Sequence, residues 1–238
     1  MTFQSDVVLL PIPSSRDGVS FCDLSVAEEK MRDEIKSGDA VIGYAIPKKW
    51  ADHFAERGVF VFDMETDEEL LQYNAALTAD AALGKILTMS NRAPRDLDIG
   101  IIGCGRIGYR LLGGLTFLGA NVTVFTTSRA IEAEVCAIGA HGVNATHLSD
   151  CDKYREFSNL DILINTAPAR LISESVADLL AGKLVIELAS GDNIPKQIEY
   201  VRWGSLPGKV YPMSAGYALG KYVVRAITTI EQNKRMLL

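Results

Sequence analysis

The sequence has few of the patterns that mark membrane, nucleic-acid or metal-binding proteins. The apolar run Val7 to Leu10 is too short for a signal peptide or a membrane span, and prolines soon follow it. Lysine and arginine total 24 against 30 acidic residues, without a basic stripe, so we expect no nucleic-acid partner. The four cysteines (Cys22, Cys104, Cys136 and Cys151) lack metal-ligand spacing and are expected as reduced thiols in a cytoplasmic protein.

Histidine is equally scarce, which limits acid–base chemistry. Of the three copies, His53 and His141 are expected at the surface, and His147 lies before a predicted helix. No Ser/His/Asp set, metal cluster or P-loop is visible. The remaining composition, 48% apolar and 23% charged over 238 residues, is that of an ordinary globular protein with one large domain or two small ones.

A glycine-rich turn at residues 103–108 is the most informative motif. The apolar run Ile99 to Ile102 leads directly into G-C-G-R-I-G, and leucines then recur at helical spacing until a second apolar run at 122–125. This strand–turn–helix–strand unit fits within about 30 residues, as a dinucleotide-binding fingerprint requires. The first glycine permits the tight turn, the second lets the pyrophosphate approach, and the third allows close helix packing. The predicted cofactor contacts here are Gly103, Gly105, Arg106, Ile107 and Gly108.

The end of the second strand indicates which dinucleotide is bound. NAD sites usually place Asp or Glu about 20 residues past the glycines. Here the chain has Thr127, Ser128 and Arg129, and hydroxyls beside an arginine suit the 2′-phosphate of NADP. The alternative is that Ser128 only starts the next helix and Arg129 is solvated. We favour NADP, with NAD possible.

Strand patterns alternate with helix patterns along the whole chain, which predicts a parallel α/β fold. We expect a smaller α/β domain over residues 1–90, ending in a linker helix. A doubly wound, Rossmann-type domain should span 91–238, its C-terminal helix packing back on the first part. Expected elements include helices at 25–38, 47–57, 75–89 and 172–181, and a last strand at 209–211.

Polar loops follow several of these strands, and in doubly wound sheets ligands bind beyond the carboxyl ends of the strands. Thr166, Ala167 and Pro168 follow one strand and are predicted to border the nicotinamide half of the cofactor. Glu187 and Ser190 follow the next strand as candidate catalytic residues, Glu187 either accepting a proton or holding neighbouring loops. Hydroxyl and amide groups that could donate hydrogen bonds to a substrate occur in four further candidates: Ser14, Ser15, Asn74 and Thr78.

The motifs resemble one family over nearly the whole chain: the A subunits of dipicolinate synthase. The similar segments are LLPIPSS, YNAALTADAAL, LGANVTV, DILINTAP, LVIELASG and LPGKVYPMSAG. D-2-hydroxyacid dehydrogenases are similar more distantly. Those enzymes use a His–Glu pair, and no histidine lies in 188–216, so lactate-type chemistry is disfavoured.

The resemblance implies an NAD(P)-dependent oxidoreductase that oxidises a dihydrodipicolinate-type ring to pyridine-2,6-dicarboxylate during sporulation. It also implies a flavoprotein-like second subunit, and a homo-oligomer is expected. Family members carry roughly fifty more residues before LLPIPSS, so we expect a truncated, flavodoxin-like N-terminal domain. Asp80 and Glu187 stand where the family has Glu and Asp. The alternatives are a catalytically reduced NADP-binding or partner-binding homologue, or a different small-acid dehydrogenase.

Overall fold

The structure, a computed structural model, describes residues 7–15, 35–145 and 155–236. Residues Asn74–Ser214 form one compact unit, and the described residues before and after them form the other. Most of the helix predicted at 25–38 lies outside the described residues, as do Cys22, His147 and Cys151. Among the described residues, none of the helices has the length and hydrophobicity that a membrane span requires.

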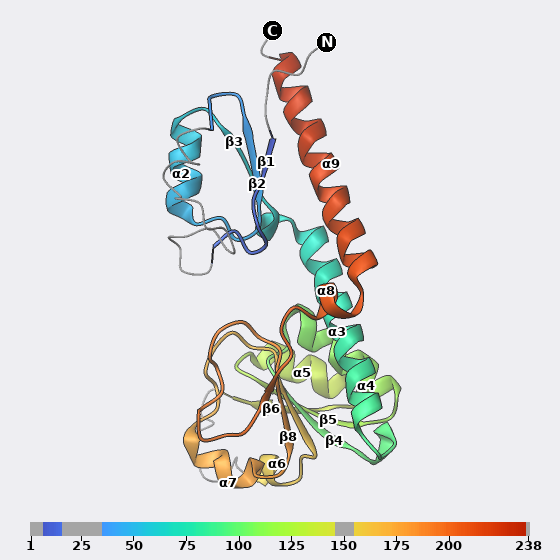
Figure 1. Ribbon diagram of the computed structural model, residues 1–238. Coiled ribbons are helices and arrows are strands. Elements are labelled where there is room, and N and C mark those ends of the chain that lie inside the picture. Colours follow the sequence, from blue (N-terminus) through green and yellow to red (C-terminus); the bar gives the residue numbers. More distant parts are fainter. Residues whose placement is uncertain (1–6, 16–34, 146–154, 237–238) are drawn as a thin grey trace. The chain divides into compact units, whose positions relative to one another are not determined.

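The first unit is built on a three-stranded parallel sheet in the order β1-β2-β3. Its elements are β1 (Val7–Leu9), β2 (Ala40–Gly43), α2 (Lys48–Glu56), β3 (Phe60–Asp63), η1 (Met64–Thr66), the start of α3 (Glu68–Met89) and most of α9 (Pro212–Met236). Figure 1 shows α2 and α9 on opposite faces of this sheet. Accordingly, Val41 packs with Trp50 of α2, whereas its neighbour Ile42 packs with Tyr222 of α9.

The carboxyl ends of β2 and β3 are tied together by one carboxylate. Ala45 adopts a left-handed conformation with φ 54°, which is costly for a residue with a side chain. Asp63 supports it by accepting hydrogen bonds from the N–H groups of Ala45 (3.0 Å), Ile46 (2.9 Å) and Glu65 (2.9 Å). On the outside, Arg225 of α9 pairs with Asp67 and Glu69.

The second unit is a six-stranded, all-parallel sheet in the order β6-β5-β4-β7-β8-β9. Its elements after α3 are η2 (Pro94–Asp96), β4 (Asp98–Ile102), α4 (Arg106–Phe117), β5 (Asn121–Thr126), α5 (Arg129–Ala137), β6 (His141–Asn144), α6 (Arg155–Ser158), β7 (Ile162–Asn165), η4 (Glu174–Val176), α7 (Ala177–Leu180), β8 (Leu184–Glu187), β9 (Val201–Arg202) and α8 (Leu206–Val210). The strand order reverses between β4 and β7, as in doubly wound dinucleotide-binding folds. The predicted parallel α/β, Rossmann-type fold is confirmed.

Burial on both faces explains the apolar strand sequences of this sheet. Ile101 and Ile164 belong to the core cluster that also contains Leu111 and Leu115 of α4. Ile102 and Leu163 face the other cluster, around Phe125 and Phe157. Because parallel sheets are covered on both sides, their strands are nearly continuous apolar runs.

Some predicted elements differ from the structure. Residues 209–211 are not a strand, because α8 occupies Leu206–Val210 and Pro207 suits a first helical turn. The last strand of the sheet is instead β9, and His141, which was expected only to be exposed, begins the edge strand β6. Residues 172–181 form two short helices, η4 and α7, in place of one.

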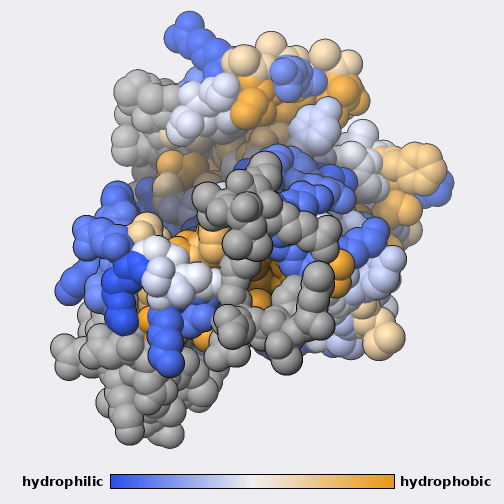
Figure 2. All heavy atoms as spheres, turned by 90° about the horizontal axis from the view of Figure 1, so that it is seen from above, coloured by the Kyte–Doolittle hydropathy of each residue, from blue (hydrophilic) through white to orange (hydrophobic). Residues whose placement is uncertain are grey.

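The side chains on the drawn face of the molecule are mixed in character. Hydrophilic residues are interspersed with smaller groups of hydrophobic ones (Figure 2). Among the exposed apolar residues of the second unit, Phe117 is 90% exposed and Met213 86%.

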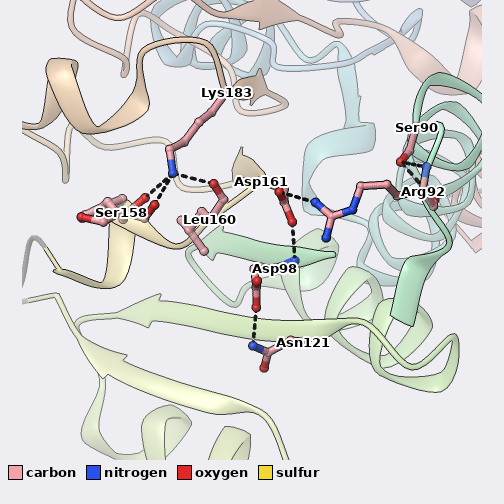
Figure 3. A network of polar contacts seen from close by, with 9 residues as sticks. Ser90, Arg92, Asp98, Asn121, Ser158, Leu160, Asp161 and Lys183 are labelled. Atoms are coloured by element: carbon pink, nitrogen blue, oxygen red, sulfur yellow. Dashed lines mark hydrogen bonds and ion pairs between the residues drawn. The ribbon is translucent and has the colours of Figure 1, made fainter. Parts of the chain in front are cut away.

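A polar network secures the amino ends of the strands in the second unit (Figure 3). Asp161 binds Arg92 at 2.6 Å and accepts the N–H of Asp98 at 2.9 Å. Lys183 donates to the carbonyl oxygens of Phe157 (3.1 Å), Ser158 (2.6 Å) and Leu160 (2.6 Å), which lie in and just after α6. The network lies at the strand ends opposite to the glycine loop and therefore serves the fold.

Replacing Lys183 by methionine should lower the free energy of unfolding by about 2–3 kcal/mol, because three carbonyl groups lose a charged donor. Lys48→Met is the control, since among the described residues Lys48 pairs only with the exposed Asp52, and it should change stability by less than about 0.5 kcal/mol. Urea denaturation of both variants measures the difference. Equal effects would mean that Lys183 adds no more than a surface ion pair.

Candidate dinucleotide-binding site

The glycine loop joins β4 to α4 at the point where the strand order reverses. Gly103 has φ +83°, a conformation that side chains rarely adopt, and its N–H donates to the carbonyl of Phe125 at 2.8 Å. Gly105 caps the amino end of α4 without a side-chain hydrogen bond. The free N–H groups and positive dipole end of a helix start favour an anion.

The three glycines differ in what a side chain would meet. Apart from its own residue and its two chain neighbours, a Cβ on Gly105 would have no atom within 4 Å, so the loop leaves space at this exposed position. A Cβ on Gly108 would overlap the carbonyl oxygen of Gly103 and lie 2.9 Å from the hydroxyl of Thr166. Gly108 therefore permits the helix to pack against the loop itself, and Gly105 is the glycine that a pyrophosphate can approach.

The other two residues of the loop have separate surroundings. Arg106 is exposed in the first turn of α4, whereas the side chain of Ile107 packs against the core. Cys104 also packs there, and burial, with the carboxylate of Glu134 adding to it, raises the pKa of its thiol. A neutral thiol beside the loop does not add negative charge to a site for phosphate.

The carboxyl end of β5 carries the three residues predicted to bind a 2′-phosphate. Thr127 and Arg129 are exposed, and Arg129 makes no hydrogen bond or ion pair with any described residue. Ser128 is the N-cap of α5, because its hydroxyl accepts the N–H of Ile131 at 3.4 Å. Ser128 thus starts the helix, as the alternative interpretation of the sequence held. Arg129 remains available to an anion.

The loops after β7 and β8 are joined by a buried amide–carboxylate pair. Asn165 is 2% exposed and Glu187 is fully buried. The amide of Asn165 donates to Glu187 Oε1 at 2.9 Å, and the N–H of Ala189 donates to the same oxygen at 3.0 Å. Asn165 also holds its own loop through the carbonyl and N–H of Ala167 (3.1 and 3.2 Å). Two roles were considered for Glu187 from the sequence, proton transfer and the holding of neighbouring loops. Its hydrogen bonds have the geometry of the second role.

Burial is the main influence on the Glu187 carboxyl group. It raises the pKa, which the hydrogen bonds from Asn165 and Ala189 and the charge of Arg202 oppose. Glu187 Oε2 has no hydrogen-bond partner among the described residues, so one oxygen carries both contacts.

This raised pKa makes stability depend on pH in a defined direction. The unfolded carboxyl group ionises near its ordinary pKa of 4.5, whereas the folded one ionises only at higher pH. Its contribution to stability is therefore fully present below that ordinary value and is lost as pH rises through the folded pKa. Glu187→Gln should consequently gain stability relative to the wild type across this window, as measured by urea denaturation at several pH values. A difference that stays constant with pH would contradict the raised pKa.

Arg202 of β9 organises the loop that contains the second catalytic candidate. Its guanidinium donates to the carbonyl of Gly191 at 2.7 Å and to the carboxylate of Asp192 at 3.1 Å. Ser190 is exposed in this loop, and its carbonyl accepts the amide of Asn193 at 2.8 Å. Neither Arg202 nor Asn165 was among the site residues predicted from the sequence. Asn165 could have been recognised from the sequence, because it is a polar residue at the end of an otherwise apolar strand.

The four substrate-binding candidates belong to two units. Ser14 is fully buried in the first unit, where its hydroxyl accepts the N–H of Tyr44 at 3.0 Å, and Ser15 beside it is half-buried. Asn74 and Thr78 are in the second unit, on α3, where the Thr78 hydroxyl donates to the carbonyl of Asn74 at 2.8 Å. Ser14 thus holds the loop after β1, and a substrate role for these residues stays a prediction.

Comparisons with known proteins agree with this architecture. A family model described as NADP oxidoreductase, coenzyme F420-dependent, matches residues 98–191. The A subunit of dipicolinate synthase from Bacillus subtilis is 25% identical over 172 residues, which cover 69% of this chain and 56% of that protein. The matched part therefore spans little more than half of the curated relative.

Solved structures show the same fold. The structure of that Bacillus subtilis dipicolinate synthase chain matches with a TM-score of 0.78 and 20% identity, over 96% of this chain and 79% of that one. D-lactate dehydrogenase from Escherichia coli matches more weakly, with a TM-score of 0.56 and 15% identity over 84% and 82% of the two chains. Sequence and fold together confirm that the chain resembles the family of dipicolinate synthase A subunits.

Proposed function

We propose that the chain binds NADP and is an oxidoreductase of the same type as the dipicolinate synthase A subunits. The observation that carries this proposal is the glycine loop at the reversal point of the sheet, with open space at Gly105 before α4. We expect the pyrophosphate to lie there, because a helix start supplies N–H donors and a favourable dipole. The similarity to dehydrogenases and to one chain of dipicolinate synthase supports the reaction class.

The chain's own residues would hold the cofactor along the carboxyl edge of the sheet. In this proposal the loop at 103–108 binds the pyrophosphate, and Thr127, Ser128 and Arg129 bind the 2′-phosphate of NADP. The loop at 166–168 borders the nicotinamide half. The bound cofactor supplies the hydride acceptor, and the protein supplies position and charge.

The proposed substrate is a dihydrodipicolinate-type ring, which becomes pyridine-2,6-dicarboxylate by losing a hydride and a proton. Ser15 and Asn74 are the proposed donors to its carboxylates, and Ser14 and Thr78 are proposed to hold the backbone beside them, since Ser14 accepts the N–H of Tyr44 and Thr78 donates to the carbonyl of Asn74. Ser190 is the exposed candidate at the end of β8, and Glu187 acts beneath it by holding Asn165 and Ala189. A flavoprotein-like second subunit, a homo-oligomer and a cytoplasmic location are further parts of the proposal.

The test of the reaction is formation of pyridine-2,6-dicarboxylate, followed by its ultraviolet absorbance, with NADP and a dihydrodipicolinate-type substrate. The purified chain is assayed alone and with a flavoprotein-like partner. Product in either mixture supports the proposal. NADP binding without product in any mixture would instead identify a nucleotide-binding homologue without turnover. Oxidation of 2-hydroxy acids would indicate a different small-acid dehydrogenase.

A further inference from the structure

Thr166 makes its polar contacts to the backbone around the glycine loop. Its hydroxyl lies 3.0 Å from the carbonyl oxygen of Ile102 and 3.1 Å from that of Gly103, so its single hydrogen is shared between them. Its N–H also donates to the carbonyl of Ile102 at 2.9 Å. Thr166 is the first residue after β7, and these hydrogen bonds connect it to the end of β4 and to the first glycine of the loop.

The first and third glycines make room for this hydroxyl. A Cβ on Gly103 would lie 3.2 Å from Thr166 Oγ1, and a Cβ on Gly108 would lie 2.9 Å from it. The second glycine, Gly105, has no such neighbour. At two of the three glycines, Gly103 and Gly108, the space of a side chain is therefore filled by other atoms of the protein, and Thr166 supplies some of them.

Holding the Gly103 carbonyl also determines the direction of the next N–H. The peptide bond between Gly103 and Cys104 is planar, with its carbonyl and N–H pointing in opposite directions. Gly103 is fixed from both sides, since its N–H binds Phe125 and its carbonyl binds Thr166. The N–H of Cys104 is therefore turned away from Thr166 by a contact that exists without any ligand.

We propose that Thr166 is a positioning residue for the cofactor: its hydroxyl sets the glycine loop in the conformation that receives the pyrophosphate. This inference rests on the proposed function, because it concerns the same dinucleotide site. It differs from the sequence-based expectation of a direct contact to the nicotinamide side. The two roles predict different losses for ligands that lack one half of the cofactor.

The experiment compares Thr166→Val with the wild type for three ligands: NADPH, 2′-phospho-ADP-ribose and 2′-AMP. Valine keeps the shape of threonine and removes the hydroxyl. Binding of NADPH and of 2′-phospho-ADP-ribose should weaken equally, by about tenfold, because both contain the pyrophosphate. Binding of 2′-AMP, which lacks the pyrophosphate, should change by less than about twofold. Thr166→Ser retains the hydroxyl and should restore binding.

Thr116→Val is the matched control, since Thr116 lies on α4 and its buried hydroxyl has no partner among the described residues. It should leave all three affinities unchanged. Loss confined to NADPH would overturn the proposal in favour of a direct nicotinamide contact, and equal loss for all three ligands would reduce Thr166 to a structural residue. Unchanged binding in Thr166→Val would also overturn it. A wild type that binds none of the three would instead refute the proposed function itself.

Discussion

Replacing Gly105 by alanine is expected to weaken NADPH binding by about 30-fold or more without lowering the stability of the protein. Apart from its own residue and its chain neighbours, the added methyl group meets no protein atom within 4 Å, and the backbone there is extended, so the fold accepts it. The methyl group would instead enter the space proposed for the pyrophosphate, at a cost of about 2 kcal/mol or more. Cofactor fluorescence and thermal denaturation measure the two effects separately.

Two neighbouring glycines provide the comparison. Gly108→Ala should lower the free energy of unfolding by about 2–3 kcal/mol, because its Cβ would overlap the carbonyl of Gly103. Gly113 lies in the same helix with nothing near its Cβ, so Gly113→Ala should keep NADPH binding and add about 1 kcal/mol of stability. If Gly105→Ala binds NADPH as well as Gly113→Ala does, the pyrophosphate does not lie at this loop.

Replacing Arg129 by aspartate is the second large change that we predict. Arg129 is exposed after β5, and no described residue pairs with it. Aspartate would remove the guanidinium–phosphate pair and repel the 2′-phosphate, so NADPH binding should weaken by about 100-fold. NADH lacks this phosphate, and its binding should change by less than about threefold. Parallel titrations with the two cofactors measure the change in preference.

Arg95→Asp is the control for the Arg129 variant, because it makes the same change in charge. Arg95 is also exposed, but it lies in η2, before β4, at the other end of the strands. A long-range electrostatic effect would weaken NADPH binding in both variants. Loss in Arg129→Asp alone identifies a local contact, and equal binding of NADPH by Arg129→Asp and the wild type would contradict the 2′-phosphate site.

The sequence predicted the architecture of the second unit because each major strand is a buried apolar run followed by a polar loop. This is clearest in the unit formed by the run Ile99 to Ile102, the glycine turn and the leucines of α4. The same apolar residues indicate the secondary structure and the face that is buried in the core. The short strands were harder. β6 contains His141, Gly142 and Asn144, and β9 has two residues, so neither has an apolar pattern.

The site was predictable in position but less so in its contacts. Strand ends placed Gly105, Arg129 and Thr166 at one edge of the sheet, because parallel strands share a carboxyl edge. Contacts between loops depend on which strands are neighbours. The pairing of Asn165 with Glu187 requires β7 beside β8, and the contact of Thr166 with Gly103 requires β7 beside β4.

The most direct test of this account is a titration of the purified wild-type protein with NADPH and with NADH, followed by cofactor fluorescence. NADPH is expected to bind, and to bind more tightly than NADH, because Arg129 is available to the 2′-phosphate. Tighter binding of NADH would contradict the assignment of the phosphate site. Binding of neither cofactor would contradict the central claim that the loop at 103–108 holds a dinucleotide.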